Sequence, residues 1–307
     1  AHQTGHYHLQ AVYSRKMNTA QEFCEPYGTI SCYTDLVDFL DSELDVVYIA
    51  SPNSLHFAQA KLAILAKKHV IIEKPAVTNP SEWKELVKLA KDHQVYLFEA
   101  ARNYQEVAFQ VVKDFLSNQE ILGANFTFAK YSSKLPALLA GEMPNIFSEV
   151  YAGGALMDLN LYNIQYLEGF FGEPQSVHYT ANMEKGIDTS GVAILSYPGF
   201  QAVAIGAKDC QGQPEYRIEG SEGYIAQNSP CNVCGAVTIH YRDGREVSYD
   251  GNGDAHRMYA EFVSFVNEIA SKDTETCYEM LDHSLAVSRI LTRARADAGI
   301  VFPCDEN

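Results

Sequence analysis

Between residues 45 and 75 the chain reads DVVYIASPNSLHFAQAKLAILAKKHVIIEKP. The runs 46–50 and 70–72 are rich in β-branched residues, which predicts strands, and residues 54–66 have the apolar spacing of a helix. A strand, a helix and a second strand in this order are typical of a parallel sheet. Residues 45–50 are apolar on both faces, so we expect this strand to be central, with helices on both sides.

The same alternation continues on either side of this stretch. It predicts strands at 9–13 and 95–98 and helices at 19–25 and 81–92. From residue 124 onward the pattern changes to longer alternating strands separated by Gly, Pro and Asp turns, at 177–183, 192–197, 202–208 and 237–241, followed by helices at 258–271 and 278–298. The predicted fold is therefore α/β, a doubly wound parallel sheet followed by a second domain with a largely antiparallel sheet.

Composition excludes several classes of function. The formal net charge is -16, from 39 acidic and 23 basic side chains, and such a chain repels nucleic acid and anionic membrane. No apolar run reaches the roughly 20 residues that cross a bilayer, and residues 1–8 lack the order of a secretion signal. Seven scattered cysteines do not suit a disulfide framework, which favours a cytoplasmic protein. Cys231 and Cys234 resemble half of a zinc site, but no second pair follows, so we predict no metal.

The start of the chain looks like the end of a helix, residues 1–5, leading directly into the strand that ends at Tyr13. A dinucleotide-binding half needs a strand and a glycine-rich turn before that helix. We therefore expect about 20 further residues upstream of this sequence.

Residues just past the parallel strands are the first candidates for a binding site, because ligands bind at the carboxyl ends of such strands. Ser14, Arg15 and Lys16 follow the strand ending at Tyr13. An acidic residue there would accept the ribose hydroxyls of NAD, whereas two cations and a hydroxyl suit a 2′-phosphate, which predicts NADP over NAD. The alternative is a solvated basic turn.

Two more strand ends carry polar residues. Ser51-Pro52-Asn53 and His56 follow one strand, where Ser or Asn also serves as an ordinary helix cap. Glu73-Lys74-Pro75 follows the next, and its proline holds Lys74 extended. Taken alone, a lysine at a strand end is usually a solvated side chain.

The combination of motifs favours a functional role for Lys74 over a solvated side chain. Ser51-Pro52-Asn53-x-x-His56, then Glu73-Lys74-Pro75, then Glu99-Ala100, then Gly153-Gly154-Ala155-Leu156-Met157-Asp158 together resemble the Gfo/Idh/MocA family, in its glucose-fructose oxidoreductase and dihydrodiol dehydrogenase-like branch. The resemblance extends over the whole chain. It implies a Rossmann domain at residues 1–101 and an α+β domain with a large open sheet at 102–307, which often forms homodimers or homotetramers.

The resemblance also implies a site. Its catalytic positions match Lys74, Asp158 and Tyr162, and the last two face one way if a helix begins there. It implies cofactor contacts from eight residues: Ser14, Arg15, Lys16, Ser51, Asn53, His56, Glu73 and Lys74. Further residues are expected to line the substrate pocket: Arg102, Asn103, Phe147 and Tyr151. Many sugar-handling members have a Trp-Arg pair before the glycines, and the aromatic residues in residues 145–151 replace it here.

The implied function is a dehydrogenase or reductase that uses NADP or NAD and a sugar, a cyclic polyol or a dihydrodiol. Oxidation of a carbinol releases a proton, which a positioned base must take, and either Tyr162 or Lys74 can do so. Asp158 orients either the substrate hydroxyl or Lys74. The alternative is a non-catalytic sensor of NAD(P) on the same fold.

Overall fold

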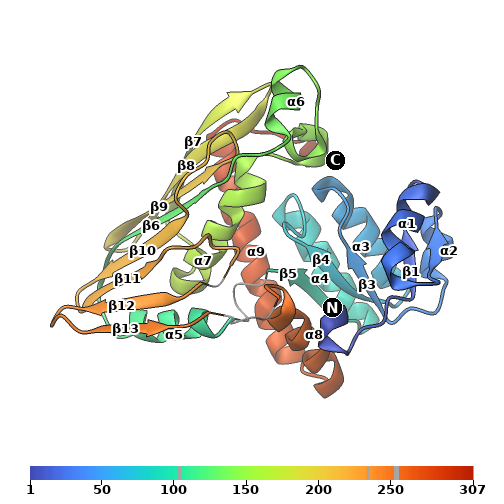
Figure 1. Ribbon diagram of the computed structural model, residues 1–307, viewed down its shortest axis with the longest axis horizontal. Helices are drawn as coiled ribbons and strands as arrows, with labels where there is room; N and C mark the ends of the chain where they lie inside the picture. The colour runs from blue at the N-terminus through green and yellow to red at the C-terminus, as the bar shows by residue number, and fades with distance from the viewer. Residues whose placement is uncertain (102–105, 234, 252–255, 307) are drawn as a thin grey trace.

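Two units make up the computed structural model, which describes residues 1–101, 106–233, 235–251 and 256–306 (Figure 1). The first contains five short parallel strands: β1 (Ala11–Tyr13), β2 (Ser31–Tyr33), β3 (Val46–Ile49), β4 (His69–Glu73) and β5 (Leu97–Ala100). β1 pairs with β2, and β4 lies between β3 and β5. The predicted parallel pairing is confirmed, in a two-stranded sheet of β1 and β2 and a three-stranded sheet of β3, β4 and β5.

The predicted central position of residues 45–50 is not seen among the described strands. In the described part of the chain β3 pairs with β4 alone, so β4 is the central strand of its ladder. Tyr48 on β3 is 40% exposed, although its ring packs against Phe262. An apolar residue on this face of the strand therefore does not indicate that the face is fully buried.

Helices pack on the strands of the first unit. They are α1 (Met17–Cys24), α2 (Leu36–Leu40), α3 (His56–Leu65), preceded by the 3-10 turn η3 (Asn53–Leu55), and α4 (Pro80–His93). The Asn79 side chain caps α4 by accepting from the backbone N–H groups of Ser81 and Glu82, at 3.0 and 3.1 Å. The fully buried Trp83 anchors α4, because its indole donates to the Leu281 carbonyl at 2.8 Å.

The second unit contains one eight-stranded sheet in the order β13-β12-β11-β10-β6-β9-β8-β7. Its strands are β6 (Ile121–Ala129), β7 (Ser176–Glu184), β8 (Ile187–Tyr197), β9 (Phe200–Ala207), β10 (Glu215–Gly220), β11 (Gly223–Gln227), β12 (Val237–Tyr241) and β13 (Glu246–Tyr249). All neighbours are antiparallel except β6 and β9, which run parallel. The prediction of a largely antiparallel sheet is confirmed.

Helices lie on one side of this sheet, between it and the first unit (Figure 1). The helical segments of this part are α5 (Val107–Leu116), α6 (Leu135–Leu139), η5 (Asn145–Phe147), η6 (Glu149–Tyr151), the π-helical turn η7 (Leu156–Asn160), α7 (Leu161–Phe171), α8 (Tyr259–Ser271) and α9 (Thr274–Asp297). α7 and α9 pack on the sheet through a core that includes Phe126, Tyr166 and Ile290. Gly299 follows α9 at φ 69, in the left-handed conformation expected after a helix.

The last helices connect the two units. Phe262 and Phe265 of α8 pack with Phe98 of β5, and Leu281 of α9 belongs to the core under α3 and α4. A division of the chain at residue 101 stays a prediction. The cores show that the end of the chain returns to the first unit.

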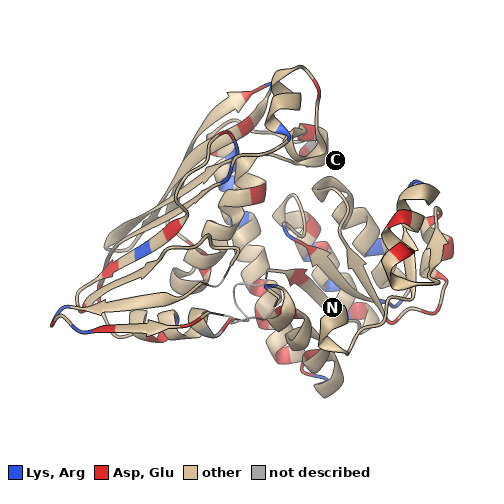
Figure 2. Cartoon of the chain, in the orientation of Figure 1, with Lys and Arg blue, Asp and Glu red and all other residues tan. Residues whose placement is uncertain are grey.

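Charged side chains of both signs are distributed over both units (Figure 2). In the part of the chain that the structure describes, no helix is both long and apolar enough to span a bilayer.

Candidate active site

Lys74 stands where the two units meet. It follows β4 directly, the Lys74-Pro75 peptide bond is cis, and its side chain is 12% exposed. The ammonium donates to Asp158 Oδ1 at 2.9 Å and to the Asp158 carbonyl at 3.1 Å. It also lies 4.6 Å from the ring centroid of Tyr162, within the range of a cation–π contact. The structure thus brings together the three predicted catalytic residues.

The glycine pair explains how Asp158 reaches this place. A side chain at Gly153 would put Cβ 2.6 Å from the Ile146 carbonyl oxygen, and Gly154 has φ +105, which favours glycine. Just after the pair, the Leu156 N–H donates to the buried Asp188 carboxylate at 2.6 Å. The close turn and this bond fix the start of η7, which carries Asp158.

The helix that follows is fixed on β9. Asn160 donates to the Ala204 carbonyl at 3.0 Å and Asn163 donates to the Ile205 carbonyl at 3.0 Å. The helix lies so close to the strand that a Cβ at Gly206 would be 2.5 Å from Asn160 Cβ. As a result, the end of β9 lies beside Asp158.

Lys208, immediately after β9, is the residue that sequence reasoning missed. Its side chain is 2% exposed, and its ammonium donates to Asp158 Oδ2 at 2.6 Å and lies 4.9 Å from the Phe147 ring centroid. Its backbone N–H donates to the Thr189 carbonyl at 2.8 Å, and its carbonyl accepts from Ser132 at 2.9 Å. In the sequence Lys208 is only a lysine at a strand end, with no spacing that relates it to Lys74.

The three charges have distinct electrostatic environments. Burial, the largest single effect, would lower the pKa of Lys74, but the neighbouring Asp158, Tyr162 and Glu73 together outweigh burial and raise this pKa. Burial alone would raise the pKa of Asp158, but Lys74 and Lys208 hold it well below its usual range. For Lys208 burial dominates and lowers the pKa, and the positive charge of Lys74 adds to this effect. The pair of Lys74 and Asp158 is therefore an ammonium and a carboxylate.

Aromatic rings surround this group. Tyr162 is 5% exposed and its ring lies 6.0 Å from that of Phe128. Phe147 was predicted to line the substrate pocket, but it is fully buried beneath Lys208, so it supports that side chain instead. Tyr151 is half-buried in η6. Arg102 and Asn103, also predicted for the pocket, lie outside the described residues.

The predicted cofactor residues follow the carboxyl ends of β1, β3 and β4. Arg15 and Lys16 are exposed and Ser14 is half-buried. Ser51 donates to Gln59 at 2.7 Å, and Asn53 donates to the Ala152 carbonyl at 2.8 Å, which joins the two units. Hydroxyl groups and unburied cations at strand ends have the donor chemistry that phosphates and ribose hydroxyls need, so these residues fit a dinucleotide.

His56 and Glu73 hold the strand ends together through bonds within the protein. His56 is 1% exposed, and its ring nitrogens lie 2.9 and 2.8 Å from the carbonyls of Pro75 and Ser51. Glu73 accepts from the Tyr48 hydroxyl and from the Lys74 N–H. Their predicted contact with the cofactor stays a prediction, and both residues bond to the segment that carries Lys74.

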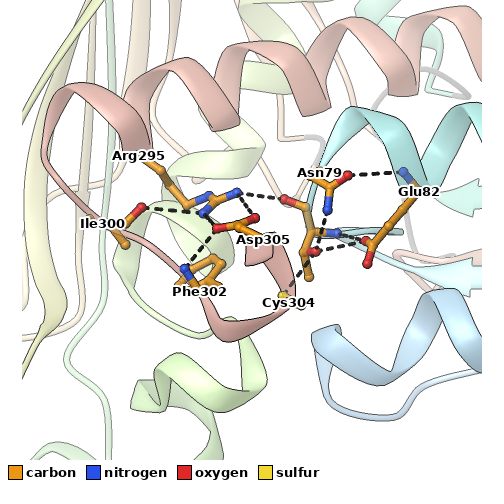
Figure 3. A network of polar contacts seen from close by, with 8 residues as sticks. Asn79, Glu82, Arg295, Ile300, Phe302, Cys304 and Asp305 are labelled. Atoms are coloured by element: carbon orange, nitrogen blue, oxygen red, sulfur yellow. Dashed lines mark hydrogen bonds and ion pairs between the residues drawn. The ribbon is translucent and has the colours of Figure 1, made fainter. Parts of the chain in front are cut away.

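The chain end holds the loop that follows Lys74 (Figure 3). Arg295 of α9 donates to Asp305 Oδ2 at 2.6 Å and to the Thr78 carbonyl at 3.0 Å. Cys304 lies 3.3 Å from the Thr78 hydroxyl, which itself donates to Glu82 at 2.8 Å. This polar network connects α9 and the chain end to the segment between β4 and α4.

Known oxidoreductases match this chain in sequence and in overall fold. Residues 1–101 match the profile of an oxidoreductase family with an NAD-binding Rossmann fold, GFO_IDH_MocA, and residues 120–226 match a GFO/IDH/MocA C-terminal domain. The chain is 33% identical to scyllo-inositol 2-dehydrogenase (NADP(+)) IolU of Bacillus subtilis, over 98% of this chain and 92% of that protein.

It is 25% identical to human trans-1,2-dihydrobenzene-1,2-diol dehydrogenase, over 96% and 90% of the two chains. In structure it resembles KijD10, a 3-ketoreductase from Actinomadura kijaniata solved with NADP and TDP-benzene. The TM-score is 0.80 at 21% identity, with 94% and 89% of the two chains covered, which shows a shared fold.

Proposed function

Because the chain belongs to the Gfo/Idh/MocA family of NAD-binding oxidoreductases, we propose that it moves a hydride between NADP and a carbinol or carbonyl carbon of a sugar, cyclic polyol or dihydrodiol. Family membership confirms the predicted fold class, the oxidoreductase reaction class and the nicotinamide cofactor. The observation that carries the proposal is the buried ion pair of Lys74 and Asp158 beside Tyr162.

The substrate class rests on relatives and on the site. The two similar enzymes are named for scyllo-inositol and for a dihydrodiol, and both compounds carry neighbouring hydroxyl groups on a ring. The site offers an ammonium and a phenol for such hydroxyls, within an aromatic setting that suits a ring.

The chain's own residues divide the proton chemistry among them. When bound, the nicotinamide supplies the hydride acceptor or donor. Since Asp158 raises the pKa of Lys74, Lys74 stays protonated and acts as a hydrogen-bond donor to the substrate oxygen. We therefore assign the proton transfer to the hydroxyl of Tyr162. Asp158 accepts bonds from a lysine at each of its oxygens, so its role is to orient Lys74 rather than the substrate.

NADP is the preferred cofactor in this proposal. Arg15 and Lys16 follow β1 as exposed cations, and a 2′-phosphate would gain charge-assisted hydrogen bonds from them. The relative named for inositol uses NADP(+).

We also propose a homodimer or homotetramer formed through the outer face of the large sheet. Cross-strand register places Val192 and Ile194 of β8 beside Ile205 and Val203 of β9 on this face. Val192 and Ile194 are 38% and 42% exposed, and alternate with the fully buried Ala193 and Leu195. A contiguous apolar patch on an exposed face suits a second copy of the same surface.

A cytoplasmic location completes the proposal. Among the described cysteines none is bonded to another, and the sulfur atoms of Cys24 and Cys32 lie 3.5 Å apart as free thiols. Unpaired thiols at this distance suit a reducing compartment.

The test is a substrate panel of inositols, aldoses and trans-dihydrobenzenediol, with NADP+ and NAD+ followed by absorbance of the reduced nicotinamide. We expect turnover with at least one cyclic polyol or diol and a higher kcat/KM for NADP+. Lys74→Met should lower kcat by about 10²- to 10⁴-fold, because it removes the ammonium at the reacting oxygen.

A thermal unfolding curve and an NADPH-binding titration serve as controls that Lys74→Met is folded. Unchanged turnover in this variant would refute the assignment of the site. Tight NADPH binding without turnover on the whole panel would favour the sensor.

A further inference from the structure

Lys208 and Lys74 share one carboxylate. Asp158 accepts from Lys208 at Oδ2 over 2.6 Å and from Lys74 at Oδ1 over 2.9 Å. A carboxylate that is hydrogen-bonded at both oxygens by groups from different elements has one orientation available to it. A carboxylate with a single partner can rotate.

We propose that Lys208 is a positioning residue of the active site, which clamps one oxygen of Asp158 so that the other stays directed at Lys74. The clamp acts through Asp158. With a side chain only 2% exposed, Lys208 is placed to hold its neighbour and not to contact substrate.

The surroundings of Lys208 keep the clamp rigid. Its backbone is bonded on both sides, to Thr189 and to Ser132, and its ammonium lies over the Phe147 ring. Burial lowers the pKa of Lys208, and an interior lysine without a carboxylate partner would be costly to keep charged. If this position served only to fill space in the interior, an apolar side chain would be more favourable than Lys208.

Charges that face Lys208 come from several elements. Asp158 comes from η7, Lys74 from the end of β4, and Asp188 from β8. The Asp188 carboxylate already accepts from the Leu156 N–H and from the Tyr179 hydroxyl, whereas Lys208 donates to Asp158. Asp158 is therefore the anion that determines where the Lys208 ammonium lies.

The first test needs no substrate. The wild type and the variants are labelled with ¹³C,¹⁵N-lysine, and their Cε–Nζ correlation spectra are recorded by carbon-detected NMR. The Lys74 and Lys208 signals are assigned from their loss in Lys74→Met and Lys208→Met. We expect the Lys74 signal to shift in Lys208→Met, because the freed carboxylate reorients. Lys208→Arg should return it toward the wild-type position.

Lys185→Met is the matched control. Lys185 bonds to the Leu138 carbonyl and not to Asp158, so its loss should leave the Lys74 signal unchanged. Thermal unfolding checks that each variant is folded. An unshifted Lys74 signal in folded Lys208→Met would overturn the proposal.

The second test rests on the proposed function and uses whichever polyol the panel identifies. Lys208→Met should lower kcat by roughly tenfold with KM within about twofold, since the clamp does not touch substrate. The acid limb of the pH–rate profile should move to higher pH, because the pKa of Asp158 rises when one of its two cations is lost. Lys208→Arg should restore most of kcat.

The two tests fail in different ways. A shift of the Lys74 signal without turnover on any substrate supports the clamp and counts against the proposed reaction. A change in KM alone, with kcat and pH profile unchanged, overturns the clamp even if the reaction is as proposed.

Discussion

Gly154 combines two requirements that only glycine meets. Its φ of +105 is strained for any other residue, and a Cβ would overlap Asp188 Oδ1. Asp188 cannot move away cheaply, because it also accepts from the Tyr179 hydroxyl at 2.8 Å and from Leu156. We predict that Gly154→Ala lowers the free energy of unfolding by about 3 kcal/mol, the combined cost of strain and overlap. Urea denaturation measures it.

Gly199→Ala is the control for strain without overlap. Gly199 has φ +92 in the turn between β8 and β9, and no atom lies within 4 Å of a Cβ built there. Its substitution should cost about 1 kcal/mol. Equal losses in both variants would show that Asp188 does not restrict Gly154.

Only those site residues that belong to sequence motifs could be predicted from the sequence. Lys74 precedes a proline and Asp158 follows a glycine pair, and both patterns reflect local backbone requirements. Lys208 has no such pattern, because its place depends on the docking of η7 onto β9 across Gly206. Packing between segments that are far apart in the chain produces no recognisable spacing of residues in the sequence. Burial of Phe147 and the bonds of His56 were missed for the same reason.

The segment after α9 forms an element of its own, fixed by one buried cation. Arg295, with a side chain only 3% exposed, donates to both oxygens of Asp305, at 2.6 and 3.1 Å. Asp305 also accepts from the Phe302 N–H at 2.9 Å. We predict that Asp305→Asn lowers the free energy of unfolding at neutral pH by roughly 1–3 kcal/mol, the usual value of hydrogen bonds to charged groups.

The pH dependence of this loss has a definite sign. Burial alone would raise the pKa of Asp305, but the bonds from Arg295 and Phe302 lower it below 3.8, its ordinary value. The stability that the carboxylate contributes is therefore complete above that value and is lost as pH falls through the lower folded-state pKa. Urea denaturation should show the wild type and Asp305→Asn converging below about pH 3.8.

Asp92→Asn provides the comparison for an exposed ion pair. Asp92 pairs with Lys88 on the surface of α4, where solvent screens the interaction, so no measurable loss is expected at any pH. A wild-type advantage over Asp305→Asn that stays constant through acid pH would contradict the assigned ion pair.

Elements with one clear periodicity were predictable. α4, expected at 81–92, occupies Pro80–His93, and β12 was expected at its observed bounds. β10 was missed, because its charged residues Glu215, Arg217 and Glu219 face outward and mask the apolar alternation. The edge position of β3 depends on which strands pair, and the apolar content of one strand does not reveal that.

The two units of the chain share helices, so the large sheet is not an independent attachment. α9 packs on β7 and α7 of the second unit and on β5 and α4 of the first. Since these helices cover one face of the sheet, the apolar surface left over lies on the other face. This outer face is the one that we propose for the contact between copies of the chain.

Ile194 is central to this surface, with His178 of β7 and Val203 of β9 as cross-strand neighbours. A lysine there would place an unpaired charge inside the proposed two-fold interface, where each copy meets the same substitution. We predict that Ile194→Lys weakens self-association by roughly a hundredfold, as measured by sedimentation velocity over a concentration series. Leu62→Lys is the control, because Leu62 is equally exposed, at 42%, but lies on α3 in the first unit. If both variants sediment like the wild type, the outer face of the sheet does not hold the copies together.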